Sequence, residues 1–406
     1  MTAPAYEFVI YGATSFVGQI MCQYIIENYA EGEVRWAAAG RSQDKLDKLV
    51  ASLGRDIDTI VAAADDEPAL QSMVVQAQVI LSTVGPYALY GSPLIKVCAQ
   101  SGTDYCDLTG EPQWIRRMIS AHEEEAKASG ARLVHCCGFD SIPFDMGNFY
   151  LQQQSQQQYG AAATTVKMAV NKMQGGGSGG TIASAINMIK EASKDAQLRK
   201  DLGNPYYFCS ADHGFTASQR NVTGAVYDDE FQSWVGPFIM AAINTKIVHR
   251  SNELSGKAFG EQFKYDEVMI TGNSFAARMG ASSIGIGMGF FALMVALPPT
   301  RYVVEALVPK PGEGPSPEAQ LNGFFDLSFV GKTENGEALQ VRVTGDRDPG
   351  YGCTAKMLVQ SGLCLARDVS KDDKPGGFWT PATAMGDALV TRLVDGAGMT
   401  FTVEQA

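Results

Sequence analysis

Residues 12–18 read Gly12-Ala13-Thr14-Ser15-Phe16-Val17-Gly18, directly after a short apolar run and directly before apolar residues at helical spacing. This order predicts a strand, a tight turn and a helix. Backbone N–H groups at such a turn, together with the positive end of the helix, can bind a pyrophosphate. The spacing is G-x-x-S-x-x-G, with Ser15 where many dinucleotide-binding turns have glycine, so an ordinary turn of a flavodoxin-like sheet stays open as the alternative.

The same alternation of strand and helix continues to about residue 136. Strands are expected at 34–39, 59–63, 79–84, 105–108 and 132–136, and helices at 44–53, 68–76, 93–101 and 112–129. The strands are continuous apolar runs, which is typical of a parallel sheet covered by helices on both faces. We therefore predict an α/β fold with a Rossmann-type dinucleotide-binding domain over residues 1–150.

The pattern changes near residue 152, where the polar run QQQSQQQYG begins. Residues 151–375 mix strands and helices without the earlier rhythm, and we predict a second, mixed α/β (α+β) domain for substrate binding and dimerisation. Within it, residues 326–330 and 339–344 are expected to pair as antiparallel strands. A closing helix within about 376–396 is expected to pack back on the first domain.

The composition is that of an acidic globular protein, with 32 Lys and Arg against 44 Asp and Glu and a net charge of -12. Such a charge repels nucleic acid, so we expect no nucleic-acid partner. The eight cysteines form no C-x-x-C pair and lie at no metal-ligand spacing with histidine, so we expect no metal site and no disulfide. The N-terminal residues lack a signal-peptide pattern, from which we expect a cytoplasmic protein.

A second sign of nucleotide binding is Gly40-Arg41-Ser42, at the end of the second predicted strand. NAD-binding proteins usually carry an acidic residue there for the ribose hydroxyls, whereas Arg41 and Ser42 can bind a 2′-phosphate. We therefore predict NADPH as the cofactor in preference to NADH. A solvated surface arginine stays open as the alternative for Arg41, and Asp65, placed to border the adenine, can equally be a solvated loop acid.

The nicotinamide is expected at the carboxyl edge of the sheet, where the fourth strand ends with Thr83, Val84, Gly85 and Pro86. Tyr87 and Tyr90 follow, and a tyrosine hydroxyl can donate a proton if its surroundings lower its pKa. These two are the candidate catalytic residues. Packing of the rings under the cofactor or against the second domain is the alternative.

Candidate substrate contacts follow the later strands of the same sheet. Asp107 and Glu111 lie at the end of the fifth strand and can act as acid, base or substrate anchor. Either can equally cap the helix that begins at Pro112. Asp140 follows the last strand of the domain in a similar position.

A glycine-rich run, GGGSGGT at residues 175–181, contributes the last two candidates, Ser178 and Thr181. Such a loop before a helix can fold over the cofactor or bind an anionic substrate group at the helix end. A flexible connector is the alternative. We expect Ser178 and Thr181 to contact the substrate.

Taken together, the segments of the first domain resemble the saccharopine dehydrogenase-like oxidoreductase family. GATSFVG, AGRS, TVGPYALYGSPLIKVCAQSGTDYCDLTGE and GFDSIP occur in the family's order and spacing. Later segments resemble the branch that includes mycobacterial trans-acting enoyl reductases, namely GGGSGGTIAS, PFIMAAINTKIVHRS, PGEGPS, GDRDPGY and GGFWTPATAMGDALV. The resemblance implies NADP(H) use, a second domain that pairs subunits into a homodimer, and a C-terminal segment that returns to the first domain. It supplies no catalytic acid that maps onto a residue of this chain.

The most apolar stretch is SIGIGMGFFALMVALP, residues 283–298. About sixteen residues are short for a bilayer span, and we predict a buried core helix. The wall of an apolar pocket, a dimer face and a shallow membrane contact are the alternatives. The last of these would make the cytoplasmic protein peripherally membrane-associated.

Three functions are compatible with these features. The leading hypothesis is an NADPH-dependent reductase of an enoyl or carbonyl group on a lipid-like substrate, with Tyr87, Tyr90 or a water as the proton source. The first alternative is a saccharopine-type amino-acid dehydrogenase, whose substrate would require converging arginines that the sequence does not show clustered. The second is a non-catalytic NADPH-binding, lipid-associated protein.

Overall fold

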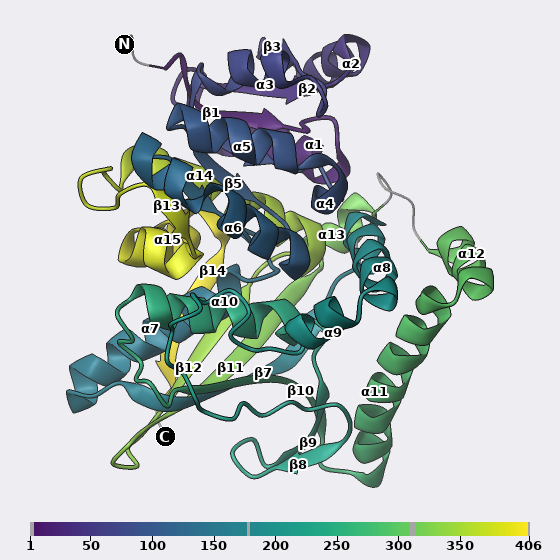
Figure 1. Cartoon of the computed structure of the whole chain (residues 1–406), viewed down its shortest axis with the longest axis vertical. Helices are drawn as coiled ribbons and strands as arrows, with labels where there is room; N and C mark the ends of the chain where they lie inside the picture. The colour runs from purple at the N-terminus through teal and green to yellow at the C-terminus, as the bar shows by residue number, and fades with distance from the viewer. Residues whose placement is uncertain (1–3, 177–178, 309–313, 405–406) are drawn as a thin grey trace.

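The computed structural model describes residues 4–176, 179–308 and 314–404. In this part of the chain the strands form two sheets of seven, the first in the upper part of Figure 1 and the second in the lower part. The first sheet is parallel throughout, in the order β13-β6-β5-β4-β1-β2-β3. Its strands are β1 (Tyr6–Tyr11), β2 (Trp36–Gly40), β3 (Asp58–Val61), β4 (Ala77–Ser82), β5 (Asp104–Asp107), β6 (Arg132–Val134) and β13 (Gly377–Trp379). The predicted Rossmann-type sheet is confirmed.

Helices cover both faces of the first sheet. One face is covered by α3 (Glu67–Val74), α5 (Ser92–Ser101) and α6 (Pro112–Ser129). The other is covered by α1 (Phe16–Asn28), α2 (Gln43–Leu53) and, from near the C-terminus, α14 (Thr354–Arg367). Consecutive residues of β1 therefore enter two different cores, with Val9 on one side and Phe8 and Ile10 on the other. This explains why the strands read as unbroken apolar runs.

The second sheet is mixed and has the order β14-β12-β11-β7-β10-β9-β8. Its strands are β7 (Ala163–Gln174), β8 (Val226–Asp228), β9 (Ser233–Pro237), β10 (Lys264–Gly272), β11 (Phe324–Thr333), β12 (Ala338–Gly345) and β14 (Met399–Glu404). β7 and β10 run parallel, whereas the other neighbours are antiparallel. The predicted antiparallel pair is β11 with β12, in which Ser328 lies opposite Arg342, so that prediction is confirmed.

Two long helices lie between the sheets, α7 (Ile142–Tyr159) and α10 (Ala241–Leu254). α7 packs on β11 and β12, and its contact is close because glycines stand where the elements meet. A Cβ added at Gly147 would lie 2.4 Å from Phe329 Cζ, and one at Gly331 would lie 2.5 Å from Leu151 Cδ2. Three further helices are α8 (Gly179–Lys194), α9 (Ala196–Leu202) and α13 (Pro317–Leu321), of which α8 packs on α11 (Phe275–Ala296).

The C-terminal part of the chain contributes a strand to each sheet. α14 packs on β1, β4 and β5, and β13 then pairs with β6 at the edge of the first sheet. α15 (Pro381–Ala397) packs between α14 and α7, and β14 finally joins β12 at the edge of the second sheet. The range predicted for the second domain, 151–375, thus contains a helix that covers the first sheet. The expected return begins at residue 354 and not at 376.

A buried ion pair fixes this return. Arg132 of β6 donates to the Asp104 carboxylate of β5 through Nε at 3.0 Å. The same guanidinium donates to Leu365 O at 2.8 Å and to Val369 O at 2.6 Å, at the end of α14. The carbonyl groups that end α14 are therefore satisfied by a side chain of the first sheet.

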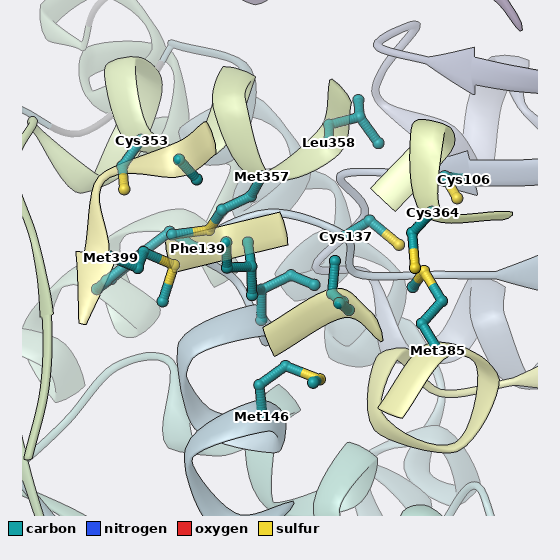
Figure 2. Packing of buried hydrophobic residues seen from close by; sticks show 14 of the residues in the cluster. Cys106, Cys137, Phe139, Met146, Cys353, Met357, Leu358, Cys364, Met385 and Met399 are labelled. Carbon is teal, nitrogen blue, oxygen red and sulfur yellow. The ribbon is translucent and has the colours of Figure 1, made fainter. Parts of the chain in front are cut away.

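One continuous apolar core runs from the first sheet through α7 to the second sheet. Figure 2 shows its centre, where sulfur-containing side chains from distant parts of the sequence meet. They include Cys106, Cys137, Met146, Met357, Cys364, Met385 and Met399. All eight cysteines lie in the described part of the chain, where they are buried and free. Because methionine adapts to irregular space, these side chains fill the junction between two differently shaped sheets.

The stretch predicted as a core helix is exposed, so that prediction is wrong. It belongs to α11 (Phe275–Ala296), which is followed by α12 (Pro298–Leu307) along one side of the molecule in Figure 1. The side chain of Ile286 is 72% exposed and that of Phe290 is 62% exposed. Small residues bring the helix close to the sheet: Ala281 is buried, and a Cβ added at Gly236 of β9 would lie 3.1 Å from the Cα of Ala281.

The exposed apolar side chains of α11 form one stripe, consisting of Phe275, Met279, Ile286, Phe290, Leu293 and Leu297. At 3.6 residues per turn they fall within about 60° of the helix circumference. The helix has 22 residues and a mean hydropathy of 1.7 in a window of which 11% is buried. By length and composition alone, this helix could cross a bilayer. Residues 283–298 by themselves are too short for a bilayer span, but the whole helix is not.

We expect Gly147→Ala to lower the free energy of unfolding by about 1–3 kcal/mol, because the added methyl group overpacks the contact between α7 and Phe329. Urea denaturation followed by circular dichroism measures the change. Gly280→Ala is the matched control, because Gly280 is also helical but an added Cβ there has no atom within 4 Å. The control should leave stability unchanged or raise it by about 0.5–1 kcal/mol. Equal effects of the two substitutions would contradict the tight contact.

Candidate active site

The turn between β1 and α1 is held by its own side chains and by the end of β4. Ser15 is the N-cap of α1: its Oγ accepts a hydrogen bond from Gly18 N at 3.0 Å and lies 2.8 Å from Thr83 Oγ1. Thr83 in turn donates to Gly12 O at 3.0 Å. The serine that departs from the common glycine pattern is therefore a helix cap.

The two glycines of the turn are required by space and by backbone conformation. Gly12 has a φ of +92°, and an added Cβ would lie 2.6 Å from Thr83 Oγ1 and 2.8 Å from Val84 Cγ2. A Cβ at Gly18 would lie 2.2 Å from Gly12 O. Within the described residues the N–H groups of Phe16 and Val17 have no acceptor. A helix start with free N–H groups and no side chain in the way fits a pyrophosphate.

A second segment, far along the chain, lies against this turn. The ring of Phe16 meets the ring of Tyr351 edge to face, with 4.6 Å between centroids. Tyr351 belongs to a short π-helical turn, η1 (Pro349–Cys353), that leads into α14. The motif GDRDPGY, residues 345–351, is thereby brought to the nucleotide-binding turn.

Arg41 is free of protein partners in the described part of the chain. It is exposed just after β2, and its guanidinium makes no hydrogen bond or ion pair with any residue that the structure describes. Ser42, the N-cap residue of α2, makes no side-chain capping bond. Burial raises the pKa of Tyr11 to about 12, and the charges of Asp65 and Arg41 act on it in opposite directions. Both residues therefore lie beside the same tyrosine, at the end of the sheet where the adenosine is expected.

Tyr87 begins α4 (Tyr87–Tyr90) and its hydroxyl is fully used by the protein. It donates to Ser82 O at 2.9 Å and accepts from Leu108 N at 3.2 Å. Burial raises the pKa of this hydroxyl well above its ordinary value. This is the geometry of a structural tyrosine that joins the ends of β4 and β5, and it gives no support to Tyr87 as a proton donor. Tyr90, by contrast, is 47% exposed.

Glu111 ties the nicotinamide edge to the second domain. Its fully buried carboxylate accepts from Tyr87 N at 2.7 Å, from Ala88 N at 3.1 Å and from Ser184 Oγ of α8 at 2.8 Å. It makes no capping bond to α6, so it caps the start of α4 instead of the helix that follows it. Burial raises the pKa of the carboxyl, while these hydrogen bonds act in the opposite direction.

The carboxylate of Asp107 is also hydrogen-bonded within the protein. Its Oδ1 accepts from Thr109 N and Cys136 N, each at 3.1 Å, and its Oδ2 lies 2.7 Å from His135 Nδ1. These bonds join the ends of β5 and β6, a structural role that we did not foresee for Asp107 from the sequence. Within the described residues, no cluster of His, Cys, Asp and Glu is arranged to hold a metal ion.

Asp140 is the carboxyl group of this edge that the protein leaves free. It lies beside Gly110, where an added Cβ would be 3.7 Å from its Oδ1, and no described residue donates a hydrogen bond to it. Burial and, after it, the charge of Asp107 raise the pKa of Asp140 to about 7. A carboxyl group that is half protonated near neutral pH can hold and release a proton.

Only part of the glycine-rich run belongs to the described residues. Ser178 lies outside the described residues. Thr181 is in the first turn of α8, the helix whose Ser184 reaches Glu111. The expected proximity of this segment to the nicotinamide edge therefore comes from Ser184, a residue of the GGGSGGTIAS motif that we did not single out.

Sequence reasoning also missed a buried polar chain in the second domain. Ser141 donates to Asn244 Oδ1 at 3.0 Å, and Asn244 donates to Glu267 Oε2 at 2.9 Å. Tyr265 donates to Glu267 Oε1 at 2.9 Å. The available signal was the placement of polar residues such as Asn244 and Lys246 within the apolar helix of the PFIMAAINTKIVHRS segment.

Comparisons with known proteins show the family of the chain and the cofactor class of its first domain. Residues 8–134 match the family model of the saccharopine dehydrogenase NADP-binding domain, so the NADP(H) prediction is confirmed. A Mycobacterium tuberculosis protein that bears a trans-acting enoyl reductase name is 40% identical, over 97% of this chain and 97% of its own length. The trans-acting enoyl reductase of Mycobacterium ulcerans is 36% identical, over 96% and 95%.

A solved structure shows the same fold. Saccharopine dehydrogenase (L-Glu forming) of Saccharomyces cerevisiae, in its apo form, superposes with a TM-score of 0.53 over 97% of this chain and 99% of that chain. Its sequence is 10% identical, so the likeness extends to the fold alone.

We expect Arg41→Ala to raise the dissociation constant of NADPH at least tenfold, because a charge-assisted contact to the 2′-phosphate is lost. The dissociation constant of NADH should change less than about twofold, since that cofactor has no 2′-phosphate. Quenching of tryptophan fluorescence measures both. The control is Lys45→Ala, which removes another exposed cation near the start of α2. Tighter binding of NADH than of NADPH by the unmodified protein would contradict the role of Arg41.

Proposed function

The chain belongs to the saccharopine dehydrogenase-like oxidoreductases, in the branch of the trans-acting enoyl reductases, and on this premise we propose that it reduces an enoyl group of a lipid-like acyl substrate with NADPH. The observation that supports the proposal most is a free carboxyl group, Asp140, at the same sheet edge as the nucleotide-binding turn. Reduction of a carbonyl group and saccharopine-type chemistry are the competing reactions.

The residues of the first domain fit a dinucleotide. The turn 12–18 offers free N–H groups to the pyrophosphate, and Arg41 with Ser42 offers an unpaired cation and a hydroxyl to the 2′-phosphate. Residues 83–86 follow the carboxyl end of β4, where we expect the nicotinamide. When bound, NADPH supplies a hydride to the substrate.

Asp140 would supply the matching proton. Reduction of an enoyl group places one hydrogen on each carbon of the double bond, and the second must come from an acid. Of the carboxyl groups at this edge, Asp107 and Glu111 are held by backbone donors, whereas Asp140 has no such partner in the described residues. Its raised pKa keeps a large fraction protonated near neutral pH. Tyr90, exposed at the rim, is the other candidate donor.

We expect NADPH oxidation with trans-2-enoyl thioesters of medium or long chain, followed by absorbance, and little with saccharopine. Because the donor must be protonated, the rate should fall as the pH rises through about 7, where Asp140 loses its proton. Asp140→Asn should reduce kcat by about 10²–10⁴-fold and abolish this limb of the pH profile.

Tyr90→Phe is the matched control and should keep both the rate and the limb. If Asp140→Asn kept the profile of the unmodified enzyme, or Tyr90→Phe lost it, the assignment to Asp140 would fail. If no enoyl substrate were reduced while keto-acyl substrates were, the carbonyl reaction would replace the enoyl one.

We also propose that the apolar stripe of α11 pairs with the same stripe of a second copy of the chain. From Met279 its members follow at intervals of seven, four, three and four residues, the alternation found where two helices pack along a seam. A stripe of this kind can meet itself across a two-fold axis. A bilayer is a weaker candidate, because the net charge of -12 is repelled by acidic lipid head groups.

The unmodified protein should therefore have about twice the chain mass of 43.5 kDa in light scattering after gel filtration. Phe290→Glu should give a monomer, because it buries a charge in the seam. Val394→Glu, at an exposed aliphatic residue of α15, is the control and should stay dimeric. A monomeric unmodified protein that sediments with lipid vesicles would refute the pairing and support the membrane instead.

A further inference from the structure

A cavity of about 740 Å³ lies in the second domain, between α10, β10, α11 and the segment 202–223. Its volume falls within the range of roughly 300–1,000 Å³ that is usual for small-molecule sites. None of the residues that line it belongs to the nucleotide-binding domain. The cavity is therefore separate from the sheet edge at which the nicotinamide is expected.

Lys246 of α10 lines this cavity without a partner charge. The residue is 4% exposed, and its Nζ donates to Ala242 O, one helical turn earlier, at 2.7 Å. It makes no ion pair with any residue in the described ranges. Burial alone lowers the pKa of its ammonium group to about 8, so the group is still mostly protonated at neutral pH. A buried ammonium with unused N–H donors is unfavourable unless an anion or another acceptor approaches it.

The other ionisable groups of the wall do not neutralise Lys246. Arg220 is paired with Asp228 at 2.6 Å and with Asp266 at 3.1 Å. Glu267 already accepts from Asn244 and Tyr265, and burial raises its pKa to about 8, which keeps it mostly uncharged at neutral pH. Lys246 is therefore the cation of this wall that has no carboxylate partner among the described residues.

The rest of the wall contains a large apolar part. Phe238, Ile239 and Val222 contribute from the loops, and Met288 contributes from α11. α11 also presents Gly285 and Gly289 to the cavity, and a Cβ at Gly289 would meet no atom within 4 Å. A Cβ at Gly285 would lie 2.3 Å from Thr223 O, so this glycine lets the loop approach the helix, whereas the open space at Gly289 leaves room for a chain of methylene groups.

We infer that this cavity binds an amphiphile with one anionic head group and a hydrocarbon chain, with the carboxylate of a fatty acid against Lys246 Nζ and the chain along α11. The charge supplies the counter-ion that the protein lacks, and the apolar wall favours the chain over a small anion. The inference does not rest on the reductase function, because the site contains no residue of the nucleotide-binding domain and binding is measured without cofactor.

Isothermal titration with dodecanoate, dodecanol and acetate tests the inference on the full chain. The unmodified protein should bind dodecanoate at least tenfold more tightly than dodecanol, and acetate far more weakly than either. Lys246→Met should weaken dodecanoate binding at least tenfold and change dodecanol binding less than about twofold. Lys264→Met, at an exposed lysine of β10, is the control and should change neither.

Gly289→Leu provides a second variant that keeps the lysine. Its side chain should fill the space beside Met288 and weaken dodecanoate and dodecanol together, while leucine is a better helix former than glycine and should not unfold α11. Equal affinity of the unmodified protein and Lys246→Met for dodecanoate would overturn the inference. So would binding of acetate as tight as that of dodecanoate, or dodecanoate binding by Gly289→Leu that is unchanged.

Discussion

The carboxylate of Glu111 connects the two halves of the molecule at the point where the chemistry is expected. It is fully buried, and its acceptors are used by two N–H groups of α4 and by the hydroxyl of Ser184 on α8. Without it, the first turn of α4 would lose its acceptor in a place that water does not reach, which leaves buried donors unsatisfied. Glu111 thus holds Ser184 of α8 at the edge where the nicotinamide is expected, and the ion pair of Arg117 with Glu191 at 2.9 Å holds the same helix against α6.

The two domains make different kinds of contribution. The first provides a rigid turn whose geometry is set by glycines and a helix cap, as expected for a site that holds the same cofactor in many proteins. The second provides the surfaces on which family members can differ: the glycine-rich segment before α8, the exposed stripe of α11 and the cavity beside Lys246. The likeness to saccharopine dehydrogenase at 10% identity illustrates that a fold is kept when the sequence has diverged widely.

The features that were predicted best from the sequence are those that neighbouring residues determine. The turn 12–18, the parallel strands and the pair β11–β12 follow from steric rules and from periodicity, so they could be recognised without the structure. The role of Tyr87 could not, because Ser82 O and Leu108 N reach its hydroxyl only in the folded chain. The pKa of Asp140 depends on burial and is likewise invisible in the sequence. The exposure of α11 was mispredicted because an apolar helix has the same composition whether other elements cover it or not.

One edge strand of each sheet comes from residues 377–404, since β13 adds to β6 and β14 adds to β12. During synthesis on the ribosome, residue 379 must therefore emerge before the first sheet is complete, and residue 404 before the second is. Until then β6 and β12 expose unpaired backbone groups, the feature of a nascent chain that invites aggregation and capture by chaperones. The two domains of this protein therefore do not complete their folding one after the other. Both are completed by the same late segment of the chain.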